Sequence, residues 1–177
     1  MFRVVKYKIS IYKILSGFKL MPIVNNVTRL LDSRKIPYTT YELPAEKLGA
    51  LETARLLDLD PATVFKTIVL RREKPGKLLL AVVPGISEVD LKLLAASLGE
   101  KKVYLPTERE AESLTGLQAG GISPLALLNK GFQVVIDSSA QNYTEIHISG
   151  GQRGLNIKLP VVELAKLTNA RFARITN

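Results

Sequence analysis

Lys66 is the first residue whose type and position suggest chemistry. It lies in the run VFKTIVL (64–70), surrounded by β-branched and apolar residues. Burying a lysine ammonium in mid-strand costs free energy unless it faces a cleft or a partner. We therefore expect the Lys66 ammonium to reach into a cleft and hold a phosphate or a carbonyl oxygen. An exposed strand face is the structural alternative.

A glycine-rich stretch, GGISP at 120–124, could bind an anion. Adjacent glycines let the backbone approach a ligand closely and present N–H groups as an anion or oxyanion site. Gly120 and Gly121 carry those groups, and the Ser123 hydroxyl could donate a hydrogen bond. The Gly-Lys-Ser/Thr ending of a Walker loop is absent. A plain loop is the alternative interpretation.

A second glycine-rich stretch, GGQRG at 150–154, offers Arg153 for recognition of phosphate or adenosine. Its alternative is a hairpin turn with a solvated arginine. Asp137 ends an apolar run, where acids are typical of turns, and we include it among the candidate substrate contacts. His147, beside Glu145, fits a structural or surface position better than a ligand position.

The rest of the inventory excludes several kinds of site. The chain has no cysteine and one histidine. This excludes a disulfide framework, a Cys-ligated zinc site, a cysteine nucleophile and a multi-histidine metal site. A Ser-His-Asp triad would have to use His147. We expect neither a metal nor a cofactor.

Charge points to a polyanionic partner. The formal net charge of the 177 residues is +9, which makes nucleic acid the first candidate. Residues 1–20 contain five lysines and arginines and no acid, so the remainder carries +4. Residues 1–20 lack a membrane-length apolar run and a secretory signal. We expect an extension outside the fold, with a basic membrane or targeting segment as the alternative.

Apolar periodicity and turn residues predict the elements that position these groups. The fraction of apolar residues, 46%, suits a single globular domain. Helices are expected at 22–35, 50–58, 87–98, 107–114 and 161–167. Strands are expected at 38–43, 64–71, 78–83, 102–105, 132–136, 144–149 and 155–159, with a short final strand. The turn at 74–77 predicts a hairpin, and the pattern favours a mixed, partly antiparallel sheet with flanking helices.

Three stretches together resemble the YbaK/ProX-type aminoacyl-tRNA editing family, and most of all its bacterial Cys-tRNA(Pro) deacylase branch. They are VFKTIVL, TGLQAGGISPLAL and VVIDSSAQNYTEIHISGGQRGLNIKLP, in this order. The resemblance covers about residues 21–175. It implies a single α/β (α+β) domain over 21–177, built around a mixed, largely antiparallel, barrel-like sheet. It also implies a cytoplasmic protein, with no membrane partner, whose cleft takes the aminoacylated 3′ end of tRNA.

The resemblance also implies roles for residues at matching positions. Lys66 matches the lysine of the cleft, and Gly120 and Gly121 with Ser123 match the loop beside the substrate carbonyl and ribose. Tyr41 matches a pocket-side tyrosine.

The turn around Gly151, with Arg153, matches a third wall of the cleft. Three positions depart from the family pattern. Asn156 replaces an aspartate, Leu48 stands at an aromatic position, and Ala126 replaces a glycine. Asn156 and Leu48 stay among the expected substrate contacts, and the departures bear on which amino acid is selected.

The resembled deacylases let the substrate's own cysteine thiol attack its ester, which releases a thiolactone and free tRNA. A thiol held over the carbonyl has a high effective concentration, so the protein only orients the ester and stabilises the oxyanion. The implied partners are tRNA(Pro) and, weakly and transiently, prolyl-tRNA synthetase. One alternative is an Ala-tRNA(Pro) deacylase that activates water. Another is a non-catalytic module that binds tRNA or a synthetase.

Overall fold

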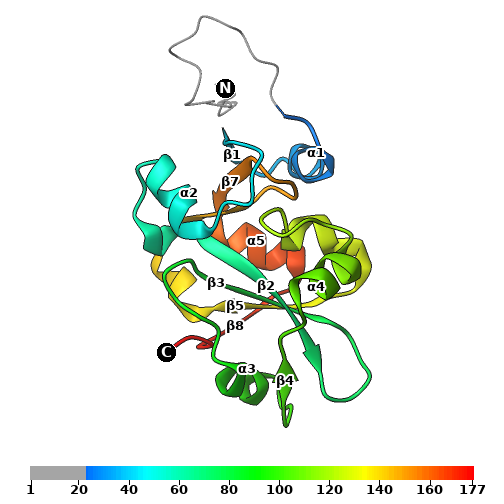
Figure 1. The fold of residues 1–177 in the computed structure, drawn as a ribbon. Helices are drawn as coiled ribbons and strands as arrows, with labels where there is room; N and C mark the ends of the chain where they lie inside the picture. Colours follow the sequence, from blue (N-terminus) through cyan, green and yellow to red (C-terminus); the bar gives the residue numbers. More distant parts are fainter. Residues whose placement is uncertain (1–22) are drawn as a thin grey trace, which may run out of the picture.

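The computed structural model describes residues 23–177 (Figure 1). Our expectation for residues 1–20 concerns a segment outside this range and stays a prediction. The α-helices are α1 Asn26–Ser33, α2 Ala50–Leu56, α3 Leu91–Leu98, α4 Glu108–Thr115 and α5 Val161–Thr168. The 3-10 helices are η2 Pro61–Thr63, η3 Pro124–Lys130 and η4 Ser138–Asn142. The strands are β1 Thr39–Glu42, β2 Phe65–Arg72, β3 Leu79–Pro84, β4 Val103–Tyr104, β5 Gln133–Asp137, β6 Glu145–Ser149, β7 Leu155–Pro160 and β8 Arg171–Ala173.

A three-stranded antiparallel sheet of order β1-β7-β6 lies at one end of the molecule (Figure 1). Its register places Tyr41 and Ser149 opposite Asn156, one from each neighbouring strand. Because side chains alternate between the faces of a strand, these residues and His147 share one face. The other face carries apolar side chains that join the core: Ile146, Ile148, Ile157 and Leu159.

A five-stranded mixed sheet of order β4-β2-β3-β5-β8 forms the rest of the framework. The predicted β2–β3 hairpin is present, and β5 runs parallel to both β3 and β8. Strand β3 is buried along its whole length. Leu80 and Val82 pack into the core shared with the three-stranded sheet, while Ala81 and Val83 join a second core that includes Leu94 of α3. A strand buried on both faces explains its continuous apolar sequence.

The mixed α/β class is confirmed, but the sheets do not close into a barrel. In the described part of the chain, a single parallel bridge, between Val64 and His147, connects the two sheets. Helix η2 ends immediately before Val64, and among residues 23–177 no ladder joins β2 to β6 beyond this bridge. Within residues 23–177, no helix combines the length and apolar character of a membrane span.

Two predicted helix starts were wrong by three or four residues. Helix α1 begins at Asn26 rather than residue 22, because the Asn25 side chain accepts hydrogen bonds from two free backbone N–H groups of the first turn. Asp90, rather than Ser87, does the same for α3. The predicted capping box of Thr107 and Glu110 is confirmed at α4.

Candidate functional site

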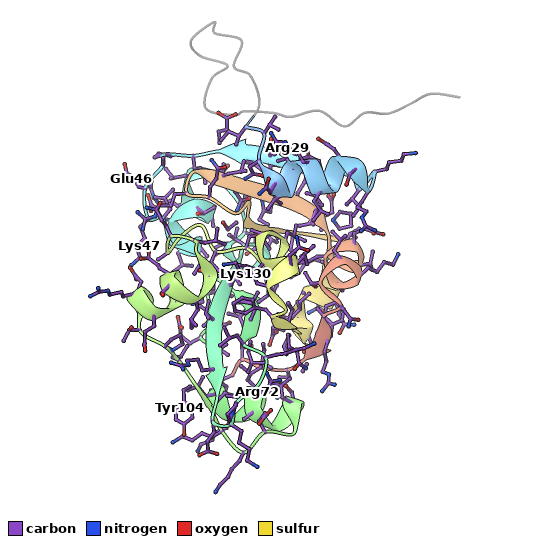
Figure 2. The ribbon with its side chains drawn as sticks, turned by 90° about the vertical axis from the view of Figure 1, so that its right-hand side faces the viewer. Arg29, Glu46, Lys47, Arg72, Tyr104 and Lys130 are labelled. Atoms are coloured by element: carbon purple, nitrogen blue, oxygen red, sulfur yellow. The ribbon has the colours of Figure 1, made fainter. Side chains whose placement is uncertain are left out.

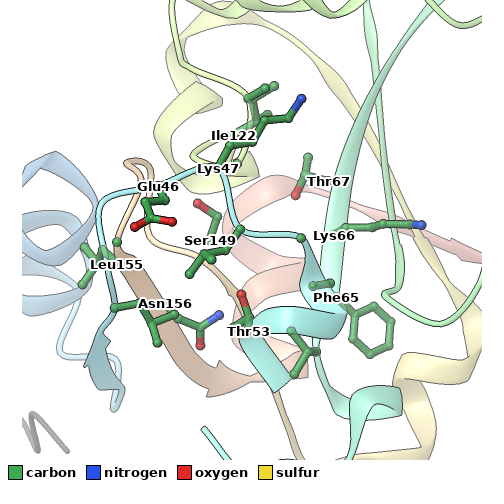
Figure 3. Close-up of a pocket in the computed structure, with 18 of the residues that line it drawn as sticks. Glu46, Lys47, Thr53, Phe65, Lys66, Thr67, Ile122, Ser149, Leu155 and Asn156 are labelled. Atoms are coloured by element: carbon green, nitrogen blue, oxygen red, sulfur yellow. The ribbon is translucent and has the colours of Figure 1, made fainter. Parts of the chain in front are cut away.

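A cleft of about 320 Å³ opens between the two sheets. Its walls are the loop after β1, the start of α2, the first half of β2, the loop before η3 and the facing ends of β6 and β7 (Figure 3). Four expected site residues line it: Leu48, Lys66, Gly120 and Asn156. The others do not: Tyr41, Gly121, Ser123, Asp137, Gly151 and Arg153.

Lys66 stands at the cleft as expected, but its ammonium is paired. Lys66 Nζ lies 2.6 Å from Glu88 Oε1, and the Glu88 side chain is 87% exposed. The Lys66 side chain extends away from Glu46 and Asn156 (Figure 3). Pairs with such an exposed carboxylate contribute little stability. An anionic ligand that reached Lys66 could therefore displace Glu88 at small cost.

Gly120 and Ile122 of the glycine loop line the cleft. Gly120 has φ +87°, and a Cβ there would come within 3.3 Å of Lys47 Cα, so the position requires glycine. Across residues 23–177 the Gly120 N–H makes no hydrogen bond. The Gly121 N–H donates to the Gln118 carbonyl oxygen at 2.9 Å. The expectation that both N–H groups are available to an oxyanion is therefore wrong for Gly121.

Ser123 lies behind the cleft wall. Its side chain is fully buried at the start of η3, and its hydroxyl has no hydrogen-bond partner in the described part of the chain. Gly151 is likewise a packing position. A Cβ on Gly151 would approach Val27 Cγ2 to 3.0 Å and Ala126 Cβ to 3.1 Å. Neither residue is placed to touch a molecule in this cleft.

Arg153 joins the two glycine-rich loops. Its Nε donates to the Ala119 carbonyl oxygen at 2.7 Å, and a Cβ on Gly121 would lie 2.9 Å from the Arg153 backbone nitrogen. The loops are therefore in direct contact. Arg153 holds the loop that carries Gly120, and the structure does not place it as a phosphate contact in the cleft.

Asp137 stabilises the C-terminal segment. Asp137 is 2% exposed, and its carboxylate accepts hydrogen bonds from Ser139 N, Ile175 N and Thr176 Oγ1. Burial alone would raise the pKa of Asp137, but these hydrogen bonds outweigh it and hold the pKa below its ordinary value. Asp137 therefore lies away from the cleft, and its carboxylate has a structural role.

The three-stranded sheet contributes a polar wall centred on Asn156. His147 Nδ1 lies 2.9 Å from Asn156 Oδ1, and the Tyr41 and His147 ring centroids are 5.2 Å apart. His147 is 4% exposed, and burial lowers its pKa, so the ring is neutral near pH 7. The expected structural histidine is therefore correct. The sequence did not lead us to its partner, Asn156, although side chains alternate along the β6–β7 hairpin and so place His147 and Asn156 on one face.

Sequence reasoning also missed several polar residues of the cleft: Glu46, Lys47, Thr53, Thr67 and Ser149. Glu46 is the one carboxylate among the described lining residues. Lys47 forms an ion pair with Glu108 of α4, and Figure 2 shows Glu46 and Lys47 close together on one side of the molecule. Ser149 could have been identified from the sequence, because it lies two residues after His147 on the same strand and therefore on the same face. Nowhere in 23–177 do three or more His, Asp or Glu side chains gather as metal ligands.

Comparison with known proteins connects this cleft to a family. The chain is 37% identical over 153 residues to a candidate Cys-tRNA(Pro)/Cys-tRNA(Cys) deacylase, EbsC, of Enterococcus faecalis, covering 85% of this chain and 92% of that protein. It is 32% identical over 97 residues to a proline–tRNA ligase of Corynebacterium efficiens, covering 52% of this chain and 16% of the ligase.

Solved structures show the same fold. The crystal structure of a candidate trans-editing enzyme for prolyl tRNA synthetase superposes with a TM-score of 0.72 at 24% identity, covering 88% of this chain and 99% of that one. Residues 45–167, which include every wall of the cleft except Leu43, match the aminoacyl-tRNA editing domain. The chain therefore belongs to the aminoacyl-tRNA editing domain family.

Proposed function

We propose that this protein is a trans-editing deacylase that removes cysteine from mischarged Cys-tRNA(Pro). One observation carries the proposal. The cleft offers a cation, Lys66, and an open N–H, Gly120, while the chain has no cysteine and its single histidine is buried behind Asn156. A site of this kind suits a substrate that supplies its own thiol nucleophile. The name of the Enterococcus faecalis relative supports the same substrate.

In the proposed reaction, the cysteinyl sulfur attacks the carbonyl carbon of its own ester. A C–S bond forms, the C–O bond to the terminal ribose breaks, and the thiol proton passes to the departing ribose oxygen. The products are a thiolactone and tRNA with a free hydroxyl. The Gly120 N–H stabilises the oxyanion, while Lys66 leaves Glu88 to hold a phosphate or ribose oxygen of the terminal adenosine.

The tRNA would be bound weakly. A small domain that contacts only the acceptor end neutralises few phosphates, so its affinity should be low and should fall with salt. We propose that prolyl-tRNA synthetase supplies specificity for tRNA(Pro) through a transient complex. Similarity to a segment of a proline–tRNA ligase supports a link to that enzyme.

Glu46 favours a second candidate function. Its carboxylate is the one acid that lines the cleft within the described residues, and it is exposed there. A carboxylate at this position could activate water against an ester that has no thiol, such as Ala-tRNA(Pro). The protein would then be an Ala-tRNA(Pro) deacylase.

The test compares deacylation of Cys-, Ala- and Ser-tRNA(Pro) by the purified protein and its Lys66→Ala variant. Lys166→Ala is a matched control, because Lys166 pairs with Glu163 on the surface of α5. Loss of the cysteinyl ester alone, abolished only by Lys66→Ala, is expected. Equal loss of the alanyl ester would move the function to the second candidate. If no ester is cleaved, the protein would instead be a non-catalytic module that binds tRNA or a synthetase.

A further inference from the structure

Asn156 occupies the centre of the polar face of the three-stranded sheet and lines the cleft. Tyr41 and Ser149 lie opposite it on the neighbouring strands. Its side-chain oxygen, Oδ1, lies 2.9 Å from His147 Nδ1 in a buried contact. An amide oxygen can only accept a hydrogen bond, so the Nδ1 atom of His147 carries the proton.

This hydrogen bond fixes which end of the Asn156 amide faces the substrate. The oxygen is held on the side of His147, and the NH2 group is turned toward Thr53 at the cleft (Figure 3). The surroundings keep the histidine in place. The Tyr41 ring contacts it, and the nearby charges of Lys158 and Glu145 lie in an ion pair of 3.7 Å.

We infer that His147 is a positioning residue that holds the Asn156 amide with its NH2 group toward the cleft, where it binds an uncharged oxygen of the aminoacyl ester. The inference rests on the proposed function for the identity of the ligand. A carboxylate at position 156 would instead accept hydrogen bonds and attract a protonated amine. The His147–Asn156 pair therefore makes this wall of the cleft a neutral donor.

The arrangement can be tested without activity, because His147 is the single histidine of the chain. In 15N-histidine-labelled protein, NMR should show Nδ1 protonated and Nε2 unprotonated at pH 7. The ring should titrate below the ordinary 6.5. Asn156→Asp should raise the pKa of His147, because a carboxylate favours the charged ring. A ring protonated on Nε2, or an unchanged titration in Asn156→Asp, would overturn the inference.

Two replacements of His147 separate positioning from packing. His147→Asn keeps an amide donor close to the position of Nδ1, whereas His147→Leu has similar bulk and no donor. With Cys-tRNA(Pro) in single-turnover assays at saturating enzyme, we expect His147→Leu to lose about tenfold in rate and His147→Asn to retain most of it. Equal losses in both variants would overturn the positioning role. If the wild-type protein cleaves no ester, the proposed function fails, and the NMR result alone decides the arrangement.

Discussion

The Nε atom of Arg153 donates a hydrogen bond to the carbonyl oxygen of Ala119 at 2.7 Å. The two residues are 34 positions apart in the chain and belong to the two glycine-rich loops. Ala119 immediately precedes Gly120, which lines the cleft and whose N–H makes no hydrogen bond within residues 23–177. The position of that N–H group therefore depends on the turn between β6 and β7.

Arg153→Ala should slow deacylation without weakening tRNA binding. Loss of the Nε hydrogen bond leaves the Ala119 carbonyl without this donor and loosens the Gly120 loop. We expect about a tenfold lower single-turnover rate on Cys-tRNA(Pro). The dissociation constant for tRNA should stay within about twofold, because Arg153 is no phosphate contact in this account. Arg29→Ala, at an exposed position on α1, is the control. A large loss of tRNA affinity with an unchanged rate would instead indicate that Arg153 contacts a phosphate or the adenosine of the tRNA.

Gly120→Ala should abolish most activity while leaving the fold intact. The new methyl group would press on the Lys47 main chain at 3.3 Å and strain a backbone with φ +87°. Gly99→Ala is a matched control, since Gly99 also has positive φ (+68°) but open space around its Cβ position. Both variants should lose about 1 kcal/mol of unfolding free energy. Only Gly120→Ala should lose deacylation, and equal rates in the two variants would contradict the role of this loop.

Glu88→Gln should strengthen substrate binding by releasing Lys66. The ion pair of 2.6 Å competes with any substrate phosphate for the same ammonium. The enzyme concentration at half-maximal single-turnover rate should fall about two- to fivefold, in keeping with the small contribution of an exposed pair. Glu163→Gln, which breaks the surface pair with Lys166, should change nothing. If Glu88→Gln weakens binding, Glu88 orients Lys66 rather than competing for it.

His147 should make the protein less stable as the solution becomes mildly acidic. Its pKa is lowered by burial from 6.5, so below that pH the unfolded chain binds a proton that the folded chain does not. Stability then falls as the pH drops below 6.5 toward the folded-state pKa. Urea unfolding between pH 7.5 and pH 4.5 measures this effect. His147→Asn should flatten the profile in that range, and an identical slope in both proteins would refute the assignment.

Asp137 should matter at a lower pH. Its pKa lies below the ordinary 3.8, so the stability it contributes is present above pH 3.8 and is lost as the pH falls through the folded-state pKa. Asp137→Asn should remove this acid-dependent part. It should leave deacylation near neutral pH unchanged in a protein that still folds, because the carboxylate lies away from the cleft. A selective loss of deacylation would indicate that Asp137 contacts the substrate after all.

The sequence predicted the framework well because that framework depends on local patterns. The β2–β3 hairpin follows from two apolar, β-branched runs on either side of a Pro-Gly turn, and the α4 capping box follows from Thr107 and Glu110. Lys66 was singled out correctly as a cleft residue because its position in an apolar strand is costly. Whether α1 begins at residue 22 or at Asn26 depends on which side chain caps the free N–H groups of its first turn, and here Asn25 does so.

The expected site residues that do not line the cleft have a different explanation. Gly121, Ser123, Gly151 and Arg153 were recognised as unusual, but the constraint on each is packing between loops far apart in sequence. A glycine needed for close approach of two loops looks the same in sequence as one needed for a ligand. Likewise, the partner of His147 becomes visible only when the register of β6 and β7 is known.

The most direct test of the account blocks the substrate thiol. Single-turnover deacylation of Cys-tRNA(Pro) is compared with that of the same tRNA after S-methylation of the cysteinyl group, with Ser-tRNA(Pro) as an unhindered control that lacks the sulfur. We expect cleavage of the free-thiol ester only, with a thiolactone detected by mass spectrometry. Cleavage of the methylated or seryl ester at a comparable rate would contradict it, because water rather than the cysteinyl sulfur would then be the nucleophile.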